Sequence, residues 1–147
     1  MRFIAALVVL SGAVSLPVHG QVQLVTAEEA RASEAAAMLM PRAVPVPDAP
    51  QIVIVSPDLK GAVSSPTKVQ LRFRAVSPAT PKPESFKALY GAFRVDITSR
   101  LLEVARPTAE GLTLEQASLP SGWHRIFLEI QDSAGRTGTQ LLSVTVN

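Results

Sequence analysis

Histidine is the side chain that most often does proton or metal chemistry near neutral pH, and the chain has two, His19 and His124. His124 has the same parity as Ile126 and Leu128 in an alternating segment, so its side chain should point into the protein. A zinc or copper site needs further imidazole or thiolate ligands, and the chain has no cysteine. We therefore expect a structural role for His124, with a ligand or catalytic role as the alternative, and we predict no metal and no other cofactor.

Nucleophilic catalysis and paired-carboxylate catalysis both lack their usual patterns. The chain has no Gly-x-Ser-x-Gly motif, and Ser121 and Ser133 lie in segments that are typical of turns. Carboxylates such as Asp96, Glu103 and Glu129 fall on different predicted strands and loops, so they do not suggest the acidic pair of a glycosidase. The sequence therefore predicts no catalytic residue and a protein that is not an enzyme.

Asp132 and Gly135 stand at the two ends of a four-residue segment between two alternating runs. This arrangement is typical of a tight turn, because Asp can accept hydrogen bonds from the backbone ahead of it and Gly tolerates a positive φ. A calcium loop would need further oxygen ligands, and residues 134–140 contain no acidic side chain. We predict a hairpin turn at this point.

Alternation of apolar and polar residues predicts the strands that carry these positions. Val69, Leu71 and Phe73 alternate with polar residues, and similar patterns separated by turn signals recur over residues 51–147. The expected strands are 51–55, 68–74, 86–90, 93–97, 111–115, 123–131 and 136–146. About seven short strands of this kind are typical of an all-β, antiparallel β-sandwich.

Two features other than strands are expected inside this region. Residues 77–83 contain three prolines and predict a loop. Asp96 or Thr98 can cap one helical turn that runs to Leu102. In that turn Asp96 and Arg100 are four residues apart and should pair, unless Arg100 instead reaches a carboxylate of a partner.

The outward parity of three neighbouring strands carries apolar side chains, namely Leu89, Phe127 and Leu141, flanked by Arg125 and Glu129. Solvent-facing positions of a sheet are usually polar, so a contiguous apolar stripe indicates a docking surface. We predict that these five residues form a partner-binding face. Two alternatives stay open: residues 38–40 of the same chain cover the stripe, or the apolar residues are scattered and unimportant.

The N-terminal residues predict export from the cytoplasm. Residues 1–20 carry Arg2 near the start, continue as an apolar run and end at Gly20, as is typical of a signal peptide cleaved near Gly20. The apolar run is shorter than the roughly 20 residues that a membrane-spanning helix needs. We expect a periplasmic or secreted protein with no membrane span in the mature chain, and an uncleaved anchor is the alternative.

Residues 21–40 should form a leader with a short helix, because Thr26 and Glu29 make a capping box and helix formers follow to the end of this stretch. The helix lacks a clear apolar stripe, so we expect it to dock weakly, to await a partner or to be a tether. Residues 41–50 contain four prolines and predict an extended linker. The β-sandwich domain is then expected to span residues 51–147.

Composition limits the kinds of partner. The formal net charge is +2 over 147 residues, which gives no reason to expect nucleic acid. Without cysteine the fold depends on its apolar core, and 47% of the residues are apolar. We expect a protein partner on a separate chain, because the last predicted strand runs to the end of the sequence. Self-association, with a second copy as that partner, stays open.

Residues 119–126 (LPSGWHRI), 132–136 (DSAGR) and 142–146 (LSVTV) form a pattern in the last two predicted strands. This pattern resembles the corresponding hairpin of bacterial immunoglobulin-like domains, which are relatives of fibronectin type III domains. The Ser-Pro pairs at 56–57 and 65–66, together with 96–100 (DITSR), resemble a group of small secreted proteobacterial proteins with one such domain. The resemblance implies an immunoglobulin-like sandwich, and it places His124 where related domains have a corner tyrosine bonded to a backbone carbonyl.

Residues 56–58 (SPD), 65–66 (SP) and 69–73 (VQLRF) also resemble the opening of small periplasmic copper-carrier sandwiches. Those proteins bind copper through a histidine at the mature N-terminus and further histidines near the end of the chain. Here the predicted mature N-terminus is Gln21, and His124 is the only histidine after it. The resemblance therefore implies the fold and not the metal function.

Together these observations predict a secreted, non-catalytic immunoglobulin-like module for binding or assembly, which docks a protein partner through a sheet face. One alternative is a sandwich that binds a carbohydrate or small ligand, for which exposed aromatic side chains would be needed. The other alternative is a periplasmic metal carrier, which would need ligands that the sequence lacks.

Overall fold

The structure is a computed structural model, and it describes residues 21–36 and 44–147. The predicted signal peptide, residues 1–20, lies outside the described residues. So does the segment 37–43, which contains the predicted cover of the apolar stripe and the first part of the predicted linker. Neither described helix has the length and apolar character needed to cross a membrane.

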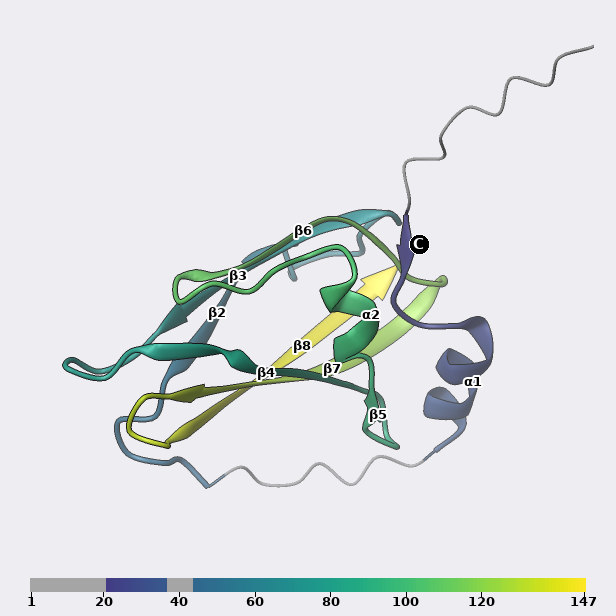
Figure 1. Ribbon diagram of the computed structural model, residues 1–147. Coiled ribbons are helices and arrows are strands. Elements are labelled where there is room, and N and C mark those ends of the chain that lie inside the picture. The colour runs from purple at the N-terminus through teal and green to yellow at the C-terminus, as the bar shows by residue number, and fades with distance from the viewer. Residues whose placement is uncertain (1–20, 37–43) are drawn as a thin grey trace, which may run out of the picture.

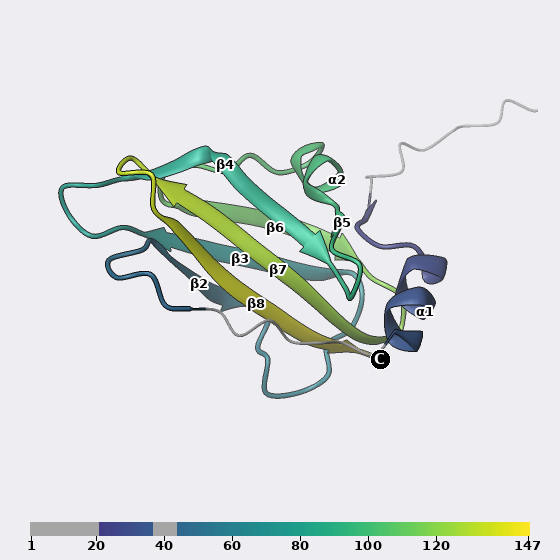
Figure 2. The same ribbon diagram turned by 90° about the horizontal axis from the view of Figure 1, so that it is seen from below.

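The described chain consists of strands arranged in two stacked sheets and two short helices. In chain order the elements are β1 (Val22–Gln23), α1 (Ala27–Ala35), β2 (Gln51–Ser56), β3 (Thr67–Arg74), β4 (Pro81–Tyr90), β5 (Val95–Asp96), α2 (Thr98–Leu102), β6 (Gly111–Ser118), β7 (Gly122–Asp132) and β8 (Thr137–Val146). One sheet has the order β1-β6-β3-β2 and the other the order β5-β4-β7-β8. Figures 1 and 2 show the two layers, with α1 at one end. The chain is an all-β sandwich, which confirms the predicted fold class.

The core lies between the sheets, and alternation in the sequence explains which side chains fill it. On β3 the side chains of Val69, Leu71 and Phe73 are buried. β7 and β8 bury their even-numbered residues, over 124–130 and over 142–146. Because successive side chains of a strand point to opposite faces, the odd-numbered residues of β7 and β8 lie on the outer face of their sheet.

Three strands differ in extent from the sequence expectation, and the simplest case is β6, which runs past the expected end at residue 115 to Ser118. β4 begins at Pro81, inside the stretch that was expected to be a loop, and Pro81 pairs with Asp132 of β7. Proline lacks a backbone N–H donor but keeps its carbonyl acceptor, so it is tolerated as the first residue of a strand. β5 is shorter than expected, because Gly91 and Arg94 both have positive φ and the residues between them form a turn.

The leader packs against the sandwich and adds a strand that the sequence did not predict. β1 pairs in parallel with β6, and the Leu24 N–H donates to the Ser118 carbonyl at 3.1 Å. Leu24 and Val25 are buried in the core with the sandwich residues. β1 is two residues long, so it offers no alternation from which it could be recognised.

α1 is capped as the sequence predicts and is tied to the sandwich by an ion pair. Thr26 Oγ1 accepts from the Glu29 N–H at 3.2 Å, and Glu29 Oε2 accepts from the Thr26 N–H at 2.9 Å. Both oxygens of Glu29 also accept from Arg100 of α2, each at 2.8 Å. The helix ends at Ala35 and the backbone of Ala36 is extended, so the helix is shorter than the expected run to Met40. Residues 37–40 lie outside the described residues.

The predicted pair between Asp96 and Arg100 is wrong. Arg100 donates to Glu29 and to the Leu24 carbonyl, the latter at 3.1 Å. Asp96 Oδ1 instead accepts from the Thr98 N–H at 2.9 Å. The better acceptor for Arg100 is the Glu29 carboxylate, because it receives two parallel hydrogen bonds from the guanidinium.

Candidate functional site

Three apolar side chains on the outer face of sheet β5-β4-β7-β8 lie in one row. Leu89 of β4 is paired with Phe127 of β7, and Phe127 is paired with Leu141 of β8. Directly opposite residues on neighbouring strands have Cβ atoms about 4.5–5.5 Å apart, so the three side chains are neighbours on the face. Each of them is partly exposed. We call these three residues the apolar row.

An arginine from the turn between β4 and β5 covers the middle of the apolar row. The Arg94 guanidinium carbon lies 3.8 Å from the centroid of the Phe127 ring. The ring quadrupole attracts a cation over its face. Arg94 has a φ of 52°, a backbone conformation that residues with a side chain seldom adopt. Arg94 was not predicted from the sequence, because only the geometry of the turn brings it over β7.

A second arginine-stacked ring lies on the same face. The Arg125 guanidinium carbon is 3.9 Å from the centroid of the Trp123 ring. The indole Nε1–H donates to Ser143 Oγ at 2.9 Å, so the ring is held by two contacts, and Trp123 is still 47% exposed. Tryptophan and arginine are enriched among the residues that contribute most to protein–protein binding. Arg125 was predicted as part of the face from the sequence, whereas Trp123 was not.

Charged side chains border the apolar row. Glu129 of β7 is paired with Lys87 of β4, and Asp96 of β5 is paired with Leu89. Hydrogen bonds from the side chain and backbone of Thr98 lower the pKa of Asp96, so this carboxylate is ionised at neutral pH. An apolar centre with a charged border is the usual arrangement of a protein interface.

The structure thus places all five residues of the predicted face on one side of one sheet. Leu89, Phe127 and Leu141 are in direct register, and Arg125 and Glu129 lie two positions away from Phe127 along β7. The arrangement offers apolar contact, cationic groups and carboxylates to a binding partner.

His124 points the other way from β7, into the core, where it is 1% exposed. Its Nε2 lies 2.7 Å from the Pro120 carbonyl oxygen and its Nδ1 lies 2.8 Å from the Tyr90 hydroxyl. A carbonyl oxygen can only accept, so Nε2 donates to Pro120, and in this tautomer Nδ1 accepts from the Tyr90 hydroxyl. Burial, together with the charges of Glu34 and Glu29, raises the pKa of Tyr90 to about 12. Both nitrogens of His124 are therefore engaged within the core.

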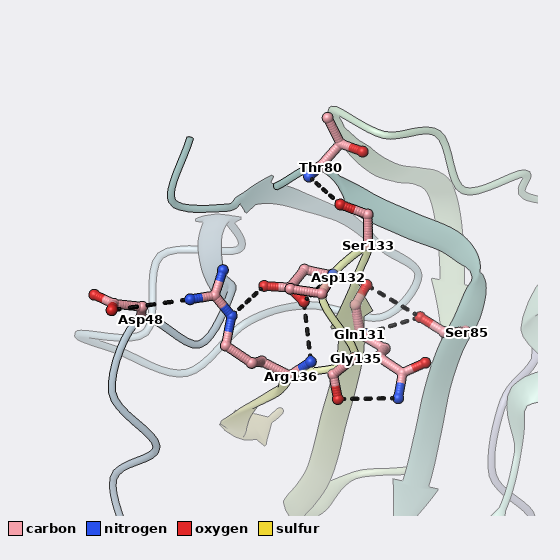
Figure 3. Close-up of polar contacts among 9 residues, drawn as sticks. Asp48, Thr80, Ser85, Gln131, Asp132, Ser133, Gly135 and Arg136 are labelled. Carbon is pink, nitrogen blue, oxygen red and sulfur yellow. Dashed lines mark hydrogen bonds and ion pairs between the residues drawn. The ribbon is translucent and has the colours of Figure 1, made fainter. Parts of the chain in front are cut away.

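Asp132 and Gly135 form the turn between β7 and β8 (Figure 3). Asp132 Oδ1 accepts from the backbone N–H groups of Ala134 and Arg136, and Oδ2 accepts from Arg136 Nε, each at 2.9 Å. Burial by itself would raise the pKa of the Asp132 carboxyl, but these hydrogen bonds outweigh it and lower that pKa. Gly135 has a φ of 81°, which explains the glycine. Both carboxylate oxygens serve the turn.

Among the residues that the structure describes, no three His, Asp or Glu side chains are grouped so that they could hold a metal ion. No protein-family model matches the chain, and no curated protein matches it. The chain is similar in structure to CopC from Methylosinus trichosporium OB3b, as seen in the crystal structure of that protein, with a TM-score of 0.44 and 20% sequence identity. The match covers 66% of this chain and 94% of that chain. The likeness concerns the fold, and no residue's role follows from it.

Proposed function

We propose that the chain is an extracytoplasmic, non-catalytic, immunoglobulin-like module that binds a protein partner through the outer face of sheet β5-β4-β7-β8. The observation that supports this most is the apolar row, because Leu89, Phe127 and Leu141 are in register and partly exposed. A solvent-facing sheet surface usually carries polar side chains at such positions.

The immunoglobulin-like part of the proposal is supported by the strand order. In immunoglobulin-like sandwiches, strands A, B and E share one sheet, and strands C, F and G share the other. Here β2, β3 and β6 share one sheet, and β4, β7 and β8 share the other. Taking β2, β3, β4, β6, β7 and β8 as A, B, C, E, F and G reproduces that order, with β1 as an addition.

The partner that fits this face is a folded protein surface with an apolar centre and carboxylates around it. The apolar row requires an apolar counterpart. The planar Arg94 guanidinium stacks on Phe127 through its face, so its N–H edges can receive a carboxylate. A carbohydrate would need open ring faces, whereas one face of Phe127 and one face of Trp123 already carry guanidinium groups. The protein partner is therefore favoured over the sugar.

The extracytoplasmic location is supported by the place where the packed structure starts. β1 begins at Val22, so cleavage near Gly20 would leave β1 and the buried Leu24 intact. The mass of the mature protein tests this part, because cleavage after Gly20 leaves Gln21 as the first residue. A full-length mass from the exported fraction would contradict it.

The binding face is tested by replacing Phe127 with serine. Chemical cross-linking of the wild-type protein in its cell envelope identifies candidate partners, and each candidate is then purified and titrated against the wild-type protein. We expect Phe127→Ser to weaken the binding of the true partner at least about tenfold, since the centre of an interface carries most of the binding free energy. The far-ultraviolet circular dichroism spectrum should not change.

Val104→Ser is the matched control, because Val104 is an exposed apolar residue, at 48%, outside this face. Binding should survive this substitution. If Phe127→Ser unfolds the domain, the face is part of the core and the proposal fails. If every partner binds Phe127→Ser as tightly as wild type, the face is not the docking surface. Quenching of Trp123 fluorescence by glycans alone would favour the carbohydrate alternative.

A further inference from the structure

β2 and β8 are the last strands of their respective sheets, and a groove of about 870 Å³ lies between them. The groove is lined by β2 over 51–54, by β8 over 137–140, by Leu59 and by part of the segment 44–50. Within its lining, the Pro50 carbonyl lies so close to Gly138 that a Cβ at that position would not fit. We call it the edge groove.

The backbone of β8 turns hydrogen-bonding groups toward the edge groove, and no other strand within residues 21–36 and 44–147 pairs with them. The Asp132 N–H donates to the Arg136 carbonyl, so these two residues are a hydrogen-bonded pair of the β7–β8 ladder. Hydrogen-bonded and non-hydrogen-bonded pairs alternate along an antiparallel ladder. Gly138 therefore turns its backbone groups toward β7, and Thr137 and Thr139 turn theirs away from it, toward the groove.

On the opposite side of the groove, β2 also turns backbone groups toward it. The Phe73 N–H donates to the Glu110 carbonyl, so β3 turns the backbone of its preceding residue, Arg72, toward β2. Arg72 pairs with Val53. The residues on either side of Val53 therefore carry their N–H and C=O groups on the free edge of β2, facing the groove.

Two strand edges thus face one groove, and within residues 21–36 and 44–147 no strand pairs with either edge there. The far end of the β8 edge is already used in this way by an extended residue. The Val63 N–H donates to the Thr145 carbonyl, and the Asn147 N–H donates to the Val63 carbonyl. A row of unpaired N–H and C=O groups is a template for an added strand.

The side chains around the groove indicate what kind of strand fits. Among the residues that the structure describes, none of those lining the edge groove carries a charge. Val44, Val46 and Leu59 are exposed at its rim, at 84%, 51% and 42%. A charged side chain buried here would lose its hydration without gaining a partner, so an uncharged segment is favoured.

We propose that the edge groove binds an extended, uncharged peptide segment of another protein as an added β-strand. Its backbone pairs with Thr139 of β8, and its alternate side chains are apolar and pack beside Leu59 and Ile54. This site rests on the strand edges and the groove, and it does not depend on the apolar row being a docking face.

A short synthetic peptide tests the proposal. The probe is acetyl-Thr-Val-Thr-Val-Thr-amide, titrated into the isotopically labelled mature protein and followed by NMR. We expect saturable shifts of backbone amides confined to β2 and to the β8 segment around Thr139, with slower hydrogen exchange of the Thr139 N–H. A peptide with the same side chains and N-methylated backbone should cause no such shifts, because it cannot donate the hydrogen bonds of a strand.

Two leucines with the same exposure provide matched variants. Leu59→Glu puts a carboxylate at the groove and should weaken peptide binding about tenfold or more. Leu102→Glu, at a residue that is also 42% exposed but lies on α2, should leave binding unchanged. The proposal is overturned if the peptide causes no saturable shifts, if the N-methylated peptide binds equally well, or if the same amides shift with protein concentration alone, which would mean that a second copy fills the groove.

Discussion

The Tyr90 hydroxyl is a buried acid whose titration can be observed directly. Tyr90 is the only tyrosine in the chain, so the absorbance of tyrosinate reports this residue alone. Burial is the main cause that raises the pKa of Tyr90 from its ordinary 10.0 to about 12. We expect a titration midpoint near pH 12 in the folded protein. The folded pKa of Tyr90 lies above the unfolded one, so its contribution to the free energy of unfolding is fully present below pH 10.0. This contribution should be lost as the pH rises toward 12. A midpoint near 10 in folded protein would contradict the buried pair.

His124 is the hydrogen-bond partner of the buried Tyr90 hydroxyl and of the partly buried Pro120 carbonyl. His124→Phe removes the acceptor for the Tyr90 hydroxyl and the donor to the Pro120 carbonyl. Each unpaired buried polar group costs about 1–3 kcal/mol, so we expect a loss of about 2–4 kcal/mol in the free energy of unfolding, measured by urea denaturation. Tyr90→Phe leaves only one ring nitrogen unpaired and should cost less. Equal losses for the two variants would show that the bond to Pro120 contributes nothing.

At the scale of elements, α1 is held on the sandwich by the Glu29–Arg100 ion pair. Arg100→Ala should weaken the docking of α1, since it also removes the hydrogen bond to the Leu24 carbonyl. The pair is partly solvent-exposed, so we expect a loss of only about 1–2 kcal/mol. The measurement is hydrogen exchange at the Leu24 N–H, which donates a hydrogen bond to the Ser118 carbonyl when the leader is docked. Arg100→Lys keeps the charge without the two parallel hydrogen bonds, so its exchange rate at the Leu24 N–H should lie between those of the wild type and Arg100→Ala.

The same ion pair makes leader docking sensitive to acid. The hydrogen bond from Arg100 is the main cause that lowers the pKa of Glu29 from 4.5 to about 2. A depressed folded pKa stabilises the docked leader fully above pH 4.5, and this stabilisation is lost as the pH falls toward 2. Protection of the Leu24 N–H should therefore decline over this range in the wild type. In Arg100→Ala, protection of the Leu24 N–H should be lower than in the wild type at neutral pH and should change little over this range. An equal decline in both proteins would contradict this origin.

The elements that the sequence predicted well are those with long alternating runs, such as β3 and β7. In these strands burial on one face requires the period of two, so Val69 and His124 could be placed inward from the sequence alone. The capping box of α1 was equally local, because Thr26 and Glu29 are three residues apart. Neither the Glu29–Arg100 pair nor the stacking of Arg94 on Phe127 has a local pattern, because each joins residues that only the fold brings together.

At the scale of the whole molecule, the packed unit is larger than the region of strand periodicity. The sequence placed the start of the domain at residue 51, where the alternation begins. The structure adds β1 and α1, and Leu24 joins core residues from both sheets, including Leu71 of β3 and Leu128 of β7. A segment that sends a side chain into the centre of the core contributes to stability in proportion to the apolar area it buries.

Substitution of Leu24 measures that contribution. Leu24 is 2% exposed, so Leu24→Ala should cost about 2–4 kcal/mol in the free energy of unfolding, as for a core leucine of the sandwich. Leu59→Ala is the matched control, because Leu59 is 42% exposed, and its cost should stay within about 0.5 kcal/mol. Thermal and urea unfolding of the mature protein give both values. Equal, small losses would mean that the leader is a tether after all. A large loss for Leu24→Ala alone means that any partner meets a sandwich already completed by residues 22–35.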